Sequence, residues 1–187
     1  MSISVTNSLT LRLYYGRYSS LVKGSTRNNV PSGTLSMADA SALRNAIRKL
    51  QDYDFAEASE AQVQEKLTAF ADSINNTLTS AAKYSGNDTS VKNAVSKIKN
   101  LNSSYSSQLK QMGITVNKDG TMSVYESAAK NYSRNRFTDF FTSDNKYLND
   151  LYDAAKTTIP ETAYIKSFEV KSAIKKFQNL RNFNIVR

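Results

Sequence analysis

Residues near the middle of the chain have the spacing of a calcium-binding loop. With Gly120 counted as the sixth residue, loop positions one, three, five and twelve are Thr115, Asn117, Asp119 and Glu126. An EF-hand supplies oxygen ligands from these positions, between two helices. Its first position is normally an Asp, whereas Thr115 supplies no carboxylate. Degenerate EF-hand-like calcium binding at 115–126 is therefore the minor alternative for this segment.

The composition removes most other reactive groups. The chain contains no Cys and no His, which excludes thiol nucleophiles, zinc–thiolate sites, iron–sulfur clusters and catalytic triads built on His. The acidic residues Asp150 and Asp153 are close in sequence, but solvent-exposed acids on a helix are the ordinary interpretation of such a pair. We therefore expect a non-enzymatic protein with no catalytic residues, no metal and no cofactor.

The net charge of +9 lies at the two ends of the chain. Residues 1–35 contain four basic residues and no acid, residues 166–187 contain six basic residues and one acid, and the segment between them is neutral. An anionic partner would be attracted to such ends, although solvated basic tails also aid solubility. The possible polyanion contacts are Arg12, Arg17, Lys171, Lys175, Lys176 and Arg181.

Three apolar stripes at helical spacing follow from residue 36 onward. Ser36 and Ser59 can cap the first two helices, with Asp39 and Gln62 at the matching capping-box positions, and the third helix is expected to begin around Asp88 or Thr89. Such stripes predict helices that pack lengthwise, as in bundles or coiled coils. The stripes are Ala40, Leu43, Ile47 and Leu50; Val63, Leu67, Phe70, Ile74, Leu78 and Ala81; and Val91, Val95, Ile98, Leu101, Tyr105, Leu109 and Met112.

A β-hairpin is predicted at 113–124, where the helical spacing stops. Gly113 to Val116 and Thr121 to Val124 alternate with a period of two, and Asp119-Gly120 lies between them. An Asp-Gly pair between β-branched runs favours a hairpin, because Gly accepts the positive φ of the turn. The residues expected to set this geometry are Gly113, Ile114, Asp119, Gly120 and Val124.

Helical character returns after the hairpin and continues toward the end of the chain. Ser143 or Asp144 is expected to start a helix that carries Tyr147, Leu148, Leu151, Tyr152 and Ala155, and Pro160 is expected to begin a last helix. The last helix would place Tyr164, Phe168, Ile174 and Phe177 inward. The expected fold class is mainly α, an elongated antiparallel helical bundle with one small β-hairpin.

The first 35 residues form a separate region in this interpretation. Leu9, Leu11, Leu13 and Tyr15 alternate with other residues, which is a weak strand pattern. We expect residues 1–35 to be a basic N-terminal arm, extended or partly disordered, and residues 36–187 to be the helical domain. No apolar run approaches the roughly 18 residues of a membrane-spanning helix.

The segment from Leu109 to Val124, LKQMGITVNKDGTMSV, resembles the hallmark of the bacterial flagellar filament-cap proteins, the hook-associated capping family. In that family a helix ends in a Leu-Gly-Ile-(Ser/Thr) sequence, an Asp-Gly-Thr turn follows, and Leu-Ser leads into the next helix. A Ser-rich helix before the segment and the pair Phe140-Phe141 after it match as well. The similarity covers about residues 105–156.

The resemblance implies a structural role. A reduced relative of the filament cap would act by helix-mediated association with itself or other proteins, at the flagellum, after export without a cleaved signal. The alternative from the charge pattern is a basic module that binds nucleic acid or another polyanion, for which a cytoplasmic location is expected. In both interpretations the protein acts by binding.

Overall fold

The computed structural model describes residues 8–22 and 24–160. The described chain is mainly helical with one two-stranded antiparallel sheet, which confirms the predicted fold class. The expected last helix, with Lys171, Lys175, Lys176 and Arg181, lies outside the described residues.

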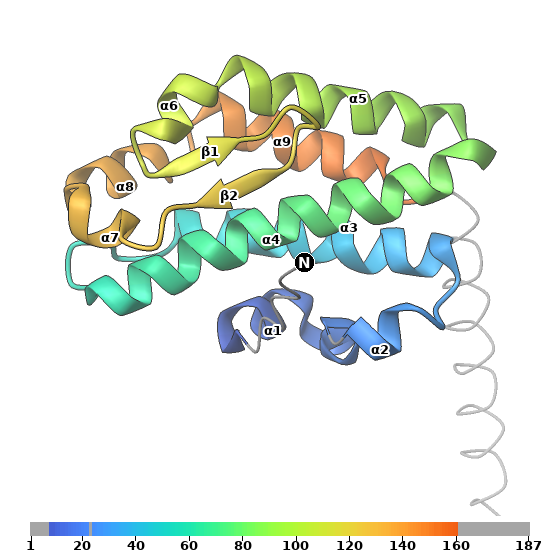
Figure 1. Cartoon of the computed structure of the whole chain (residues 1–187), viewed down its shortest axis with the longest axis horizontal. Coiled ribbons are helices and arrows are strands. Elements are labelled where there is room, and N and C mark those ends of the chain that lie inside the picture. The colour runs from blue at the N-terminus through green and yellow to red at the C-terminus, as the bar shows by residue number, and fades with distance from the viewer. Residues whose placement is uncertain (1–7, 23, 161–187) are drawn as a thin grey trace, which may run out of the picture.

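Two long helices form the centre of the bundle. Helix α3 (Ser32–Gln51) packs along α4 (Glu60–Tyr84), α9 (Lys146–Thr157) lies against α3 and α5 (Thr89–Ser104), and α5 also contacts α4. Strand β2 (Met122–Val124) lies against α4, and strand β1 (Ile114–Val116) pairs with β2 and contacts the short helix Ser106–Lys110 that precedes it (Figure 1). Residues 85–140 also form four short helical segments: α6 (Ser106–Lys110), α7 (Ala128–Asn131), α8 (Arg134–Phe140) and the 3₁₀ turn η2 (Ser85–Asn87).

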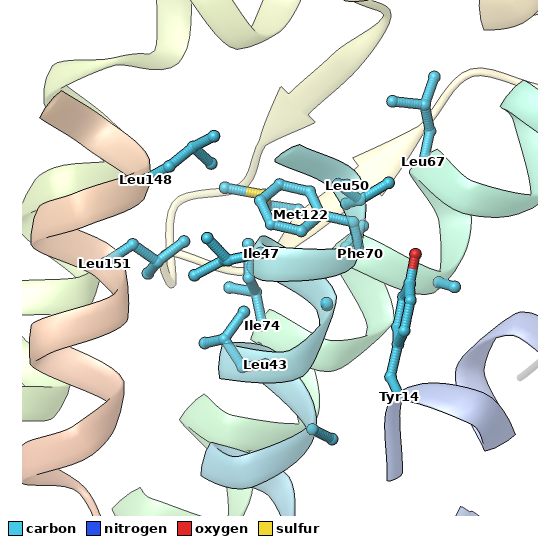
Figure 2. Close-up of a cluster of buried hydrophobic side chains, with 14 of the residues drawn as sticks. Tyr14, Leu43, Ile47, Leu50, Leu67, Phe70, Ile74, Met122, Leu148 and Leu151 are labelled. Carbon is cyan, nitrogen blue, oxygen red and sulfur yellow. The ribbon is translucent and has the colours of Figure 1, made fainter. Parts of the chain in front are cut away.

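The predicted stripes form the core. The stripe residues of α3 and α4 are all buried, and in α5 Val91, Val95 and Ile98 are buried with them. Leu148 and Leu151 of α9 and Met122 of β2 point into the same cluster (Figure 2). Because each buried Leu or Phe side chain stabilises the fold by about 1.5–3 kcal/mol, this cluster is the main source of stability.

Helix starts agree with the sequence in two of four cases. Ser59 and Gln62 form the predicted capping box, and the Asp88 carboxylate accepts hydrogen bonds from the backbone N–H groups of residues 90 and 91. Helix α9 is capped by Asn145, so the prediction of Ser143 or Asp144 is wrong. The predicted third helix is also interrupted at Tyr105, which separates α5 from α6.

The prediction of Ser36 as a helix cap is also wrong, because α3 begins at Ser32. The buried Ser36 hydroxyl instead donates a 2.7 Å hydrogen bond to the carbonyl oxygen of Thr158, which ties α3 to the end of α9. Asp39, expected in a capping box, is fully buried and pairs with Arg27. Tertiary contacts therefore use the polar groups that the local pattern assigned to a cap.

The N-terminal segment is helical, so the expectation of an extended conformation is wrong for its described part. It forms α1 (Leu9–Tyr15), the 3₁₀ turn η1 (Gly16–Val22) and α2 (Gly24–Arg27). Leu11, Tyr14 and Tyr15 are buried against α3 and α4 because positions i, i+3 and i+4 share one face of a helix. In Figure 1, α1 lies on the opposite side of α3 and α4 from α5.

Candidate functional site

The hairpin forms the sharp corner of the fold. Its register pairs Ile114 with Val124, Thr115 with Ser123, and Val116 with Met122. Ile114 is fully buried, and Val124 is partly buried against the core. The predicted hairpin is therefore present, with one face against the hydrophobic cluster.

Two glycines allow this corner to form. Gly113 has a φ of 77° and Gly120 a φ of 85°, the left-handed region that favours glycine. A Cβ at Gly113 would lie 2.5 Å from the Cβ of Ala128, and one at Gly120 would lie 2.7 Å from Cγ of Lys99. Both positions therefore require glycine for backbone conformation and for space.

Asp119 closes the turn with its own side chain. Its exposed carboxylate accepts hydrogen bonds from the backbone N–H (2.9 Å) and the hydroxyl (2.6 Å) of Thr121. These hydrogen bonds lower the pKa of Asp119, because they favour the ionised form. The side chain is thus used to hold the turn.

Amide side chains attach the hairpin to the helices. Asn75 of α4 accepts from the backbone N–H of Met122 (2.7 Å) and donates to its carbonyl oxygen (2.8 Å). Gln64, three turns earlier on α4, binds the carbonyl of Tyr125 (2.8 Å) and the N–H of Ala129 (3.1 Å) in the same two-way manner. These amides are hydrogen-bond partners for backbone groups at the edge of β2 and at the start of α7. In a larger sheet, a third strand would supply the partners of β2.

A third amide connects the turn with α5 and α9. Asn102 is fully buried; its NH₂ group donates to the carbonyl of Gly120 (2.8 Å), and its oxygen accepts from the hydroxyl of Tyr147 (2.9 Å). Burial raises the pKa of Tyr147 far above its ordinary value, so the phenol stays a donor. The sequence pattern did not predict the roles of Asn75, Gln64 and Asn102. Their position as polar residues beside the apolar stripes is the feature that could have indicated them.

The geometry of residues 115–126 differs from that of a calcium loop. A hairpin occupies the segment, the Asp119 carboxylate is engaged by Thr121, and the Thr115 hydroxyl is buried. Within residues 8–22 and 24–160, no three residues of the types His, Cys, Asp or Glu converge as a metal site would require.

Of the predicted polyanion contacts, the structure describes two. Arg12 and Arg17 are exposed, and Arg17 stacks on the ring of Tyr18 at 4.8 Å from the centroid. Arg27, another cation of this region, is instead partly buried and forms a 2.7 Å ion pair with the fully buried Asp39. Burial alone would lower the pKa of Arg27, but the hydrogen bonds and charge of Asp39 outweigh it and raise that pKa. The N-terminal segment is therefore less available to an anionic partner than its charge suggests.

An apolar pair lies on the outward face of α1. Leu9 is 65% exposed and Leu13 is 58% exposed, and they are one helical turn apart. Leu13 also borders a pocket of about 350 Å³ between α1, the end of α3 and α4. Lys49, Tyr53 and Lys66 line the same pocket. The sequence pattern did not identify this pair, because it was interpreted as one side of an extended strand.

Helix α1 is fixed in place by polar contacts at both ends. Glu65 of α4 accepts from the Ser8 hydroxyl (3.1 Å) and from the N–H of Thr10 (3.0 Å). At the other end, the Tyr15 hydroxyl donates to Asp39 at 2.5 Å and accepts from Asn76 at 3.0 Å. The Leu9–Leu13 pair is thus displayed on a positioned helix.

No helix in the described part of the chain combines the length and apolar character needed to cross a membrane. No protein-family model matches the sequence, and the curated proteins and solved structures gave no match to the chain or its fold.

Proposed function

We propose that this protein is a non-enzymatic assembly protein that associates with protein subunits, including copies of itself, through the outward face of α1. The Leu9–Leu13 pair carries the proposal. Large aliphatic side chains on an anchored helix favour burial against an apolar surface of another chain, whereas the opposite face of the same helix already packs on the bundle.

The hairpin corner supports the same role from inside the molecule. Its amide contacts fix the directions of α4, α5 and α9 relative to one another, so that a surface on the bundle keeps its shape. The resemblance of residues 105–156 to filament-cap proteins suggests the setting, a component at the tip of a bacterial flagellar filament outside the cell.

The test is the molar mass of the purified chain by size-exclusion chromatography with light scattering. We expect oligomers that persist between about 50 mM and about 500 mM salt, because apolar contacts are not screened. The double variant Leu9→Ser/Leu13→Ser is expected to shift the protein to monomers. Tyr125→Ser is the matched control, since it removes an exposed apolar residue distant from α1 in sequence and should leave the oligomer intact.

A monomeric wild-type protein at high concentration would contradict self-association. Oligomers that need a polyanion and dissociate steeply with salt would favour the second candidate, binding of nucleic acid or another polyanion through exposed Arg12 and Arg17.

A further inference from the structure

Two arginines of α3 converge on one tyrosine of α9. The NH₂ groups of Arg44 and Arg48 both donate to the hydroxyl of Tyr152, the first at 2.7 Å. Both guanidinium groups also lie over its ring, 4.6 Å and 4.9 Å from the centroid. Arg44 is partly buried and Arg48 is exposed, so the group opens to solvent on one side.

This arrangement concentrates positive charge without a neutralising carboxylate. The ion pairs of the described residues are Arg27–Asp39 and Lys146–Asp150, so neither Arg44 nor Arg48 has an acidic partner within 4.0 Å in this part of the chain. Each guanidinium repels the other, and the π face of Tyr152 compensates only weakly. An anion bound between them would remove this repulsion.

The hydrogen-bonding groups are suited to an oxyanion. The Tyr152 oxygen accepts from two arginines, which leaves its own proton free to be donated. Each guanidinium has five N–H donors and uses one on the tyrosine, and the Nε of Arg44, a buried atom, has no partner among the described residues. The planar fork of Arg matches carboxylate and phosphate oxygens, and two adjacent forks match the double charge of a phosphate monoester.

We propose that Arg44, Arg48 and Tyr152 form a binding site for one phosphate group. The two guanidinium groups bind its oxygens, and the tyrosine hydroxyl donates a further hydrogen bond. None of these three residues belongs to the basic ends of the sequence or to the Leu9–Leu13 pair, and the site does not depend on the proposed association.

The test is a calorimetric titration of the full chain with inorganic phosphate, at an ionic strength held constant with sodium chloride. We expect saturable binding with one phosphate per chain. The variant Arg44→Gln/Arg48→Gln should weaken the affinity at least tenfold. Arg136→Gln is the matched control, because Arg136 also lies over a tyrosine ring, that of Tyr132, but alone; its affinity should stay within twofold of the wild type.

Two further variants keep the test decisive if the double variant does not fold. Arg48→Gln changes only the exposed arginine and should weaken binding at least fivefold. Tyr152→Phe retains the ring and removes the hydroxyl, and it should weaken binding about three- to tenfold with an unchanged circular dichroism spectrum.

Equal phosphate affinity in the wild type and in folded Arg48→Gln would overturn the proposal. The cluster would then serve only to connect α3 with α9. Absence of saturable binding would overturn it as well. A parallel titration with sodium acetate should give at least tenfold weaker binding; equal affinity would overturn the assignment to phosphate, because the site would then not distinguish phosphate from a carboxylate.

Discussion

Gly113 and Gly120 are the residues at which a single methyl group should matter most. Each combines a positive φ with a neighbour that leaves no room for a Cβ, Ala128 in one case and Lys99 in the other. The contact at Gly113 is with the backbone and Cβ of Ala128, which cannot rotate away, whereas Lys99 is a flexible side chain beyond its own Cβ.

Gly113→Ala is therefore expected to lower the free energy of unfolding by about 2–4 kcal/mol, through left-handed strain and overpacking. Gly86→Ala is the control, since its position has open space and no positive φ; a change of at most about 1 kcal/mol is expected there. Urea denaturation measures both values. A loss at Gly113 no larger than at Gly86 would contradict the steric argument.

At the scale of elements, the hairpin depends on α4 for its stability. Two three-residue strands joined by one turn are marginal by themselves in water. Asn75 satisfies both backbone groups of Met122, and Met122 places its side chain in the core between α3, α4 and α9 (Figure 2). The hydrogen bonds from Asn75 and the burial of the side chain therefore both hold the same residue of β2, Met122.

Asn75→Ala should release β2 from α4, because two backbone groups that are partly shielded from water lose their partners. We expect a loss of about 2–4 kcal/mol and faster hydrogen exchange at the amides of residues 114–124. Asn93→Ala, at an exposed position of α5, is the matched control and should leave both quantities unchanged. Equal exchange rates in the hairpin of both variants would show that Asn75 is not a clamp.

At the scale of the whole molecule, buried tyrosines couple stability to pH. The hydroxyls of Tyr14, Tyr15 and Tyr147 lie in the interior, where burial, the largest cause, raises the pKa of all three phenols well above the ordinary value. Tyr15 and Tyr147 connect α1 with α3 and α4, and α9 with α5, so their protonated forms hold different parts of the bundle together.

The protein is expected to lose stability at alkaline pH. A folded pKa above the unfolded value stabilises the fold fully below the unfolded pKa of about 10, and this contribution decreases as the pH rises above about 10. Above this pH each buried phenol lowers the free energy of unfolding by about 1.4 kcal/mol per pH unit, because only the unfolded chain releases the phenol proton. Thermal unfolding between about pH 8 and pH 12 measures the slope.

Tyr147→Phe should reduce that slope by about one third, since one of the three buried phenols is removed. Tyr125→Phe is the control because Tyr125 is 43% exposed, and its slope should match the wild type. An identical slope in both variants would mean that the phenol of Tyr147 does not stay protonated in the folded protein.

The sequence alone determined the fold class, the main core and the hairpin. Spacings of three and four residues place Leu43, Ile47 and Leu50 on one face of α3, and this follows from the helical period without knowledge of neighbours. The turn at 119–120 was equally local, because Asp-Gly supplies the side-chain acceptor and the positive φ within a few residues.

Only the tertiary structure decided which polar groups connect the elements. Ser36 and Asp39 have the spacing of a helix start, yet neither caps α3. Ser36 binds Thr158, which is far away in the sequence, and Asp39 pairs with Arg27, which precedes α3. The pairing of Arg44 and Arg48 with Tyr152 spans more than 100 residues, so no local pattern could reveal it. Alternating leucines in the first residues fit a strand as well as a helix, and α1 became a helix because that conformation buries Leu11, Tyr14 and Tyr15 together against α3 and α4.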